Sequence, residues 1–125
     1  MILLDTDILI EIERKNEEVI TKLSQVRTEY PGEIGITSAV YSEFLFGYLK
    51  KNKKIPPDFD LLEVIDFDKE SARIFAEEKK ELEQKGTPIP LFDLITASCA
   101  LANGATVVTS DGHFKNVKRL KVIFI

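Results

Sequence analysis

The chain has 125 residues, of which 44% are hydrophobic and 30% are charged. This length and composition predict one globular domain, residues 1–125, with a sizeable buried core. The net charge is −4, which argues against a polybasic nucleic-acid binder and leaves room for a local basic patch. One cysteine and one histidine cannot build a disulfide framework or a zinc finger, so we expect any metal ion to be held by oxygen.

The first ten residues, MILLDTDILI, contain two acids and no basic residue. A secretory signal peptide begins with a basic segment, so this start is a poor signal peptide. No stretch reaches the roughly 18 uninterrupted apolar residues of a membrane span. We therefore expect a cytoplasmic protein that does not bind a membrane, with Cys99 as a reduced, packed thiol.

The first half of the chain predicts two buried strands and three helices. The strands fall at residues 2–4 and 34–36, and the helices at 8–14, at 17–29 and from Thr37 or Ser38 to the lysines at 50–54. Residues 2–4 are all apolar, which is typical of a strand buried on both faces. Thr37 or Ser38 is expected to cap the third helix, because a hydroxyl can accept a hydrogen bond from a free helical amide.

The second half of the chain repeats the alternation of strand and helix. Strands are expected at 61–66, 105–108 and 122–125, and helices at 69–85 and 91–102. Strands that alternate with helices of 10 to 15 residues are typical of βαβ units. The sequence therefore predicts an α/β fold, three-layer α/β/α, with a mostly parallel sheet of four to five strands. Ligands of such sheets bind at the carboxyl ends of the strands.

Four carboxylates stand in unusual positions. Asp93 is the only charged residue between Gly86 and Ser110, and its helical face continues with small residues. Glu43 lies on an apolar helical stripe, Asp5 ends an apolar strand, and Asp111 follows another. Each also has a structural interpretation: a helix cap for Asp5 or Asp93, a turn for Asp111, and a solvated face for Glu43.

Convergence of these four acids at one edge of the sheet would require a cation, because clustered carboxylates repel one another. Ligation by carboxylates and water favours Mg²⁺ or Mn²⁺, which can activate water and polarise a phosphoryl oxygen. The chain has neither a Ser/His/Asp arrangement nor a glycine-rich phosphate loop. Metal-dependent hydrolysis of phosphodiesters is therefore the predicted chemistry.

The sequence around the four acids resembles the PIN-domain family, and within it the VapC-type toxins of VapBC toxin/antitoxin modules. The matching segments occur in the family's order; they are LLDTDILI around Asp5, ITSAVYSEF around Glu43, IPLFDLITA around Asp93 and VVTSDGHF around Asp111. The resemblance implies a Mg²⁺- or Mn²⁺-dependent endoribonuclease with these acids as catalytic and metal-binding residues. It also implies a dimer, inhibited by a small antitoxin that inserts a segment into the active-site groove.

The chain departs from the family pattern at two positions. Asp7 stands where the family more often has Asn, and His113 stands where many members have a second Asp. The number of metal ions, and any part of Asp7 or His113, therefore stay open. Thr6, Thr109 and Ser110 are candidates for supporting hydrogen bonds, although a strand-end hydroxyl can equally satisfy the backbone.

Contacts to RNA phosphates require cations. Two basic clusters are candidates: Lys50, Lys51, Lys53 and Lys54, and then Lys115, Lys118, Arg119 and Lys121. The aromatic residues Tyr41, Phe44, Phe46 and Tyr48 circle more than one helix face, so we expect part of this cluster to be exposed. Such a surface suggests a homodimer or partner interface more than base stacking. Alternative hypotheses are a receiver domain, a dehalogenase-type phosphatase that uses Asp5 and Asp7, and a catalytically weak PIN-like module that only binds RNA or protein.

Overall fold

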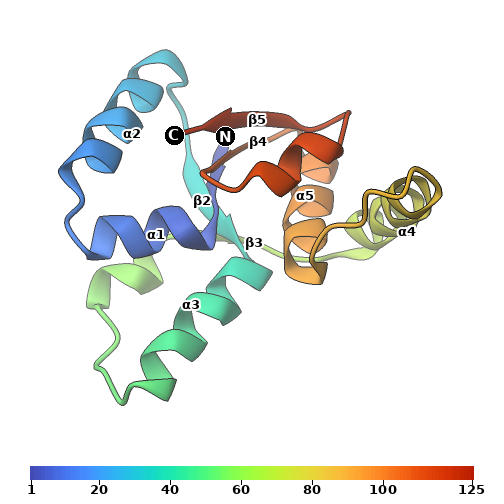
Figure 1. Ribbon diagram of the computed structural model, residues 1–125. Coiled ribbons are helices and arrows are strands. Elements are labelled where there is room, and N and C mark those ends of the chain that lie inside the picture. The colour runs from blue at the N-terminus through green and yellow to red at the C-terminus, as the bar shows by residue number, and fades with distance from the viewer.

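A five-stranded parallel sheet forms the centre of the protein in a computed structural model that describes residues 1–125 (Figure 1). The strands are β1 (Ile2–Leu4), β2 (Ile34–Thr37), β3 (Glu63–Ile65), β4 (Thr106–Thr109) and β5 (Lys121–Phe124). Their order is β3-β2-β1-β4-β5, so β1 lies in the middle, with Leu3 paired to Gly35 on one side and to Val107 on the other. The expected parallel sheet is confirmed.

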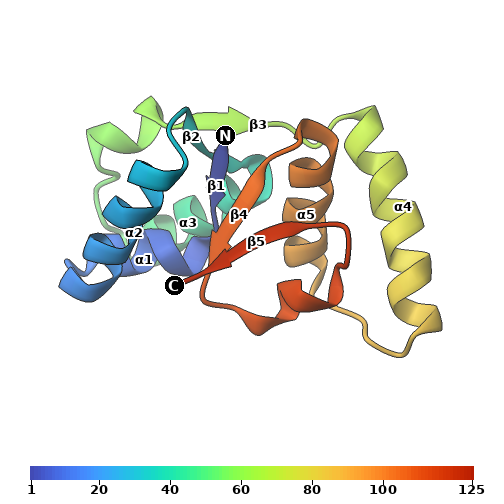
Figure 2. The same cartoon turned by 90° about the horizontal axis from the view of Figure 1, so that it is seen from above.

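Helices cover both faces of this sheet (Figure 2). They are α1 (Thr6–Glu13), α2 (Glu17–Glu29), α3 (Ser38–Lys50), α4 (Lys69–Gln84) and α5 (Leu91–Asn103). Two short 3-10 helices, η1 (Pro57–Leu61) and η2 (Gly112–Asn116), complete the fold. Residues of α1, α2, α3 and η1 pack on one face, and residues of α4, α5 and η2 pack on the other.

Alternation along β1 shows how one short strand serves both layers. Ile2 and Leu4 belong to the core on the α1 side, whereas Leu3 belongs to the core on the α5 side. All three side chains are buried, because successive residues of a strand point to opposite faces of the sheet. The three-layer α/β/α arrangement follows from this burial on both faces.

Most predicted helices and strands match the structure to within one residue at each end, and the differences at α1, β3 and β4 bear on the site or the core. Helix α1 begins at Thr6 rather than at residue 8, because Asp5 ends the strand and caps the helix at the same time. The segment before β3 contains η1, which was not predicted, so the strand is shorter than residues 61–66. Strand β4 runs one residue further than expected, to Thr109.

The aromatic cluster of α3 is less exposed than its sequence pattern suggests. Phe44 and Tyr48 are buried, and both Phe44 and Tyr41 stack close to Phe59 of η1. Among the four, Phe46 alone is largely exposed, at 54%. The expectation that part of this cluster is exposed is confirmed by Phe46, while η1, which was not predicted, covers one side of α3. None of the helices is both long enough and apolar enough to cross a bilayer.

Candidate active site

The candidate site lies where the order of the strands reverses. The chain passes from β1 outward to β2 and β3, and then returns to the other side of β1 with β4. Asp5 directly follows β1, Thr109 is the last residue of β4, and Asp111 comes two residues later. The carboxyl ends of adjacent parallel strands diverge at such a reversal, and this opening is where ligands of α/β sheets bind.

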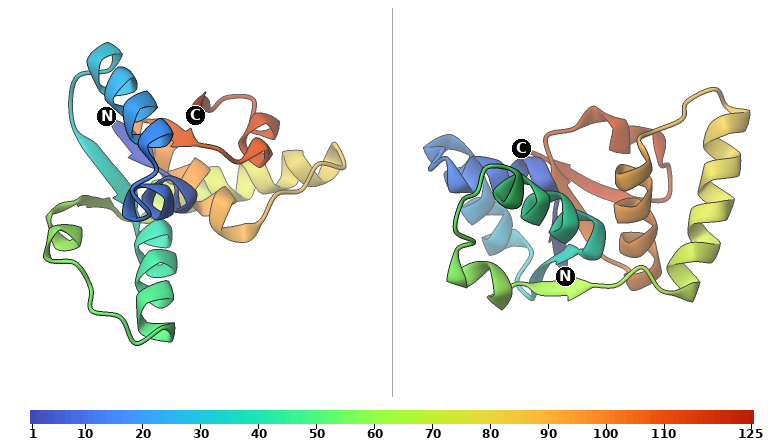
Figure 3. Two further views of the ribbon diagram at one scale, coloured as in Figure 1. Left: turned by 60° about the vertical axis from the view of Figure 1, so that its left-hand side comes forward. Right: turned by 90° about the horizontal axis from the view of Figure 1, so that it is seen from below.

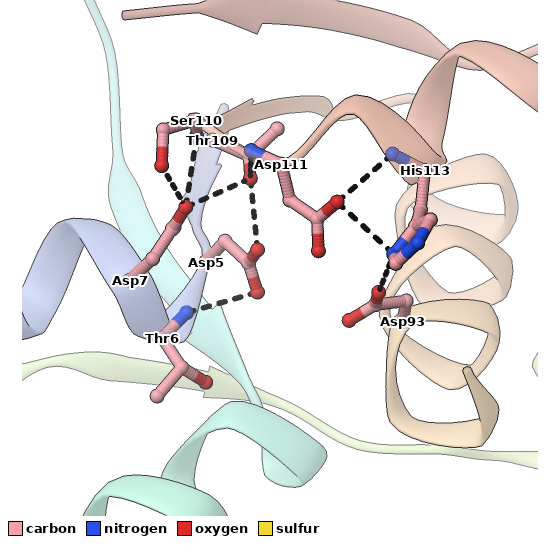
Figure 4. Close-up of polar contacts among 8 residues, drawn as sticks. All are labelled: Asp5, Thr6, Asp7, Asp93, Thr109, Ser110, Asp111 and His113. Carbon is pink, nitrogen blue, oxygen red and sulfur yellow. Dashed lines mark hydrogen bonds and ion pairs between the residues drawn. The ribbon is translucent and has the colours of Figure 1, made fainter. Parts of the chain in front are cut away.

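Asp5 occupies the floor of the site (Figure 4). Asp5 is only 5% exposed, and its carboxylate caps α1 by accepting a hydrogen bond from the Thr6 amide at 2.9 Å. The Thr109 hydroxyl donates to the other carboxylate oxygen at 2.8 Å. Burial, followed by the charge of Asp7, raises the pKa of Asp5 to about 7, although the two hydrogen bonds oppose the shift. No cationic side chain of the protein pairs with this acid.

Asp7 lies beside Asp5 and binds the end of β4. One of its carboxylate oxygens accepts the backbone amide of Ser110 at 3.0 Å, and the Ser110 hydroxyl donates to the same oxygen. Its other oxygen is buried and has no hydrogen-bond partner in the protein. A buried carboxylate oxygen without a partner is costly, so this atom calls for a ligand such as an ordered water or a cation.

Asp93, Asp111 and His113 form the second part of the site (Figure 4). Asp93 is in the first turn of α5, and the other two residues belong to the start of η2. His113 Nδ1 lies 3.0 Å from an Asp111 oxygen and 3.4 Å from an Asp93 oxygen. Burial, followed by the charge of Asp111, raises the pKa of Asp93 to about 6, against the opposing effect of His113.

Glu43 reaches the site from α3, through Thr6 rather than through another acid. The Thr6 hydroxyl donates to a Glu43 carboxylate oxygen at 2.9 Å, while the Thr6 amide donates to Asp5. Figure 3 shows α3 extending from the end of β2 alongside α1. A groove of about 180 Å³ separates these two helices, and Glu43, Arg14, Lys51 and Lys53 are among the residues that line it.

The donor set fits a divalent cation. Oxygen atoms of Asp93 and Asp111 and a nitrogen atom of His113 all lie within 4.8 Å of one another. The charges of Asp7 and Asp93 raise the pKa of Asp5, and the charge of Asp111 raises that of Asp93, so these carboxylates repel one another through the site. A cation would reverse both shifts, because it stabilises the ionised form of each acid.

Each residue singled out in the sequence has a place in this geometry. Among the four predicted acids, Asp93 and Asp111 lie in one cluster, Asp5 lies near enough for the charge of Asp93 to raise its pKa, and Glu43 is linked to Asp5 through Thr6. The supporting residues Thr6, Thr109 and Ser110 make hydrogen bonds that hold the acids. His113 also presents a ring nitrogen to the cluster, a donor that the expectation of oxygen ligands did not include. The departure of residue 113 from the family pattern was the signal that pointed to it.

Comparison with known proteins assigns the chain to a family. The PIN domain model matches residues 2–120, and the chain belongs to the PIN domain family. The chain is also 39% identical, over 93 residues, to Ribonuclease VapC2 of Rickettsia felis. That match covers 70% of this chain and 68% of the relative.

Solved structures of VapBC and Fit proteins share the fold. VapBC2 from Rickettsia felis, crystallised with a DNA fragment from its promoter, superposes with a TM-score of 0.81 and 30% identity over 100% of this chain and 99% of that one. FitAcB from Neisseria gonorrhoeae superposes with a TM-score of 0.80 and 28% identity, over 100% of this chain and 97% of that one. The similarity of fold therefore extends over the whole chain.

Proposed function

We propose that residues 1–125 form a single nuclease domain, a Mg²⁺- or Mn²⁺-dependent endoribonuclease that is the toxin of a toxin–antitoxin pair. The observation that carries the proposal is that Asp5 lies near the cluster of Asp93 and Asp111, at the point where the strand order reverses (Figure 4). No Lys or Arg side chain forms an ion pair with these acids. Ribonuclease VapC2, at 39% identity, supports RNA as the substrate. Because RNA is the substrate, we expect the protein to act in the cytoplasm.

Asp5, Asp93 and Asp111 are the proposed metal ligands, and Glu43 is the fourth catalytic acid. When bound, the metal ion supplies a Lewis acid that polarises a phosphoryl oxygen and lowers the pKa of a water molecule. The Thr109 hydroxyl donates to the Asp5 carboxylate and so orients it. The oxygen of that hydroxyl also accepts a hydrogen bond from the Asp111 backbone amide at 2.9 Å. Glu43 faces the groove, where it can accept a proton from an attacking water.

The groove beside Glu43 provides cations for the RNA backbone. Arg14, Lys51 and Lys53 line it, so one predicted basic cluster lies next to the site. The second cluster is partly engaged within the protein: Arg119 pairs with Glu78 at 2.7 Å, and Lys115 lies over the Phe124 ring. We therefore propose that RNA enters along the groove between α1 and α3.

A homodimer is also part of the proposal, although fewer aromatic side chains of α3 are exposed than the sequence suggested. Exposed Phe46 and Phe92 lie on either side of a hollow that also contains Glu43. Two exposed aromatic rings from different helices form an apolar patch that a second copy would cover. Because the patch borders Glu43, the interface would lie next to the groove.

The antitoxin partner is proposed on the same grounds. The similar structures are complexes of VapBC and FitAB type, which pair this fold with a second protein. We propose that a small antitoxin places a cationic side chain, such as Arg, among Asp5, Asp93 and Asp111. A guanidinium can form bidentate hydrogen bonds with carboxylates and compensate the charge that a metal ion would otherwise balance.

Cleavage of RNA by purified protein tests the proposal. We expect wild-type protein to cut single-stranded or structured RNA with Mg²⁺ or Mn²⁺ and to stop when a chelator is added. Asp93→Asn should abolish cleavage while the circular dichroism spectrum stays unchanged. Glu29→Gln, which removes an exposed acid at the end of α2, is the matched control and should cut normally. Full activity in chelator, or in Asp93→Asn, would contradict the proposed function.

A further inference from the structure

The only histidine of the chain points into the candidate metal site. His113 belongs to η2, and its backbone amide donates to an Asp111 oxygen at 2.9 Å, which fixes the two residues relative to each other. The side chain is 53% exposed, so it lies at the mouth of the site, while Asp5 lies buried at the floor. The imidazole therefore approaches the acids from the solvent side.

The spacing of the donor atoms matches the coordination shell of a small divalent ion. Bonds of about 2.1 Å in octahedral geometry place neighbouring ligand atoms about 3 Å apart. His113 Nδ1 lies 3.0 Å from Asp111 Oδ1 and 3.4 Å from Asp93 Oδ2. These three side chains thus present one nitrogen and two oxygens at about the separations that adjacent positions of such a shell require.

We propose that His113 Nδ1 is a direct ligand of the metal ion held by Asp93 and Asp111, and that it shifts the preference of the site from Mg²⁺ towards Mn²⁺. Imidazole nitrogen is a poor ligand for Mg²⁺, which selects oxygen, whereas transition metals accept nitrogen readily. The inference rests on the metal requirement of the proposed function and adds the identity of one ligand and the resulting metal selectivity.

A nitrogen ligand can be detected directly on bound Mn²⁺. Electron spin echo envelope modulation detects the ¹⁴N nucleus of a coordinated imidazole, and this chain contains one histidine, so the signal would have a single source. The experiment uses untagged wild-type protein with Mn²⁺ in a buffer free of imidazole. We expect ¹⁴N modulation in the wild type and its loss in His113→Gln.

His113→Asp is the matched variant, because it keeps a metal-binding side chain and changes only the donor atom. Competition of Mg²⁺ against bound Mn²⁺, followed by the signal of free Mn²⁺, gives the ratio of the two affinities. We expect the affinity for Mn²⁺ relative to that for Mg²⁺ to be about tenfold lower in His113→Asp than in the wild type. Neither measurement depends on RNA cleavage.

The outcomes separate this inference from the proposed function. Bound Mn²⁺ without ¹⁴N modulation, with an unchanged affinity ratio in His113→Asp, would show that His113 is only an ion-pair partner of the acids. That result would overturn the inference and leave a metal-dependent nuclease standing. Failure of the wild type to bind Mn²⁺ at all would overturn both this inference and the metal requirement.

Discussion

The carboxylate of Asp5 has two structural roles. It caps α1 through the Thr6 amide, and it faces the other acids of the site. Capping of α1 would by itself explain a structural role for Asp5. The pKa of Asp5 nevertheless rises to about 7, because burial and the charge of Asp7 outweigh the hydrogen bonds that its carboxylate accepts. A purely structural cap would be expected to keep an ordinary pKa or a lowered one.

The raised pKa of Asp5 predicts a pH-dependent stability of the metal-free protein. Between about pH 4 and 7 the folded state keeps a proton that the unfolded state has lost, so the free energy of unfolding should fall as pH rises. The total effect of Asp5 is on the order of 4 kcal/mol. Urea unfolding in chelator, repeated across this pH range, measures it.

Asp5→Asn is the control for this pH dependence, because asparagine also caps helices and does not titrate. The variant should lose most of the slope and be more stable than the wild type near neutral pH. The remainder of the slope should come from Asp93, whose pKa is about 6. An identical slope in the variant and the wild type would show that Asp5 is not the titrating group.

Thr109 holds the two halves of the site together. Its hydroxyl donates to Asp5 and accepts the amide of Asp111, and the residue is fully buried. Thr109→Val keeps the shape and leaves both partners unsatisfied, so we expect a loss of about 2 kcal/mol in the free energy of unfolding. Mn²⁺ binding should weaken as well, because Asp5 and Asp111 lose their common anchor.

Thr106→Val tests whether this effect belongs to the site or to the strand. Thr106 begins β4, its hydroxyl has no hydrogen bond that holds an acid, and it is nearly buried as well. We expect this change to be close to neutral for stability and for Mn²⁺ binding. Equal effects of the two substitutions would show that Thr109 acts only as a residue of the strand.

The sequence predicted the acids of the site better than their partners. Asp93 was recognisable because an isolated charge in an apolar stretch needs compensation, and Asp5 because it ends a buried strand. The partnerless oxygen of Asp7 could not be predicted, since it depends on how closely β4 passes α1. The direction of His113 depends likewise on η2, whose short turn has no periodic pattern in the sequence.

At the level of the elements, α4 and the segment after η2 are joined by a half-buried ion pair. Glu78 of α4 is almost fully buried, and Arg119 Nε contacts it at 2.7 Å. Phe114 and Val117, both buried, anchor the same segment to the α5 side of the sheet. The segment that carries Asp111 and His113 is thus held by buried apolar side chains and, beyond them, by the ion pair of Arg119.

Arg119→Met should destabilise the protein, because it leaves the Glu78 carboxylate buried without a cation. Arg119 is half exposed and water can reach the pair, so we expect a loss of about 2 kcal/mol rather than the larger cost of a deeply buried pair. Urea unfolding of Arg119→Met measures the loss. The double variant Arg119→Met, Glu78→Leu should recover most of it, and failure to recover would mean that the packing of Arg119 matters more than its charge.

Helices and strands with clear patterns were predicted at the correct places, whereas irregular elements were not. The 17–29 helix and the 2–4 strand match the structure in full, because a cap and a strong hydrophobic pattern define them. The 3-10 helix η1, which was not predicted, begins at Pro57 after the cap residue Pro56. Phe44 is buried against Phe59 of η1, and Tyr48 packs edge-on against Phe44; no local pattern encodes the contact with Phe59.

For the molecule as a whole, inhibition by an antitoxin should depend on the charge of the site. If a cationic side chain of the antitoxin binds among the acids, the double variant Asp5→Asn, Asp93→Asn should bind a co-expressed antitoxin at least about tenfold more weakly than the wild type at equal salt. Glu29→Gln should bind as the wild type does. Equal affinities of all three would show that the antitoxin contacts the helices alone.

The central claim is that Asp5, Asp93 and Asp111 converge in order to hold a divalent cation. Crystals grown with Mn²⁺ and measured for anomalous scattering test it most directly. The account predicts an anomalous peak among these three carboxylates, within about 2.2 Å of at least two of them, that is lost in crystals of Asp93→Asn. Well-ordered carboxylates with no anomalous peak between them, at a Mn²⁺ concentration that supports RNA cleavage, would contradict it.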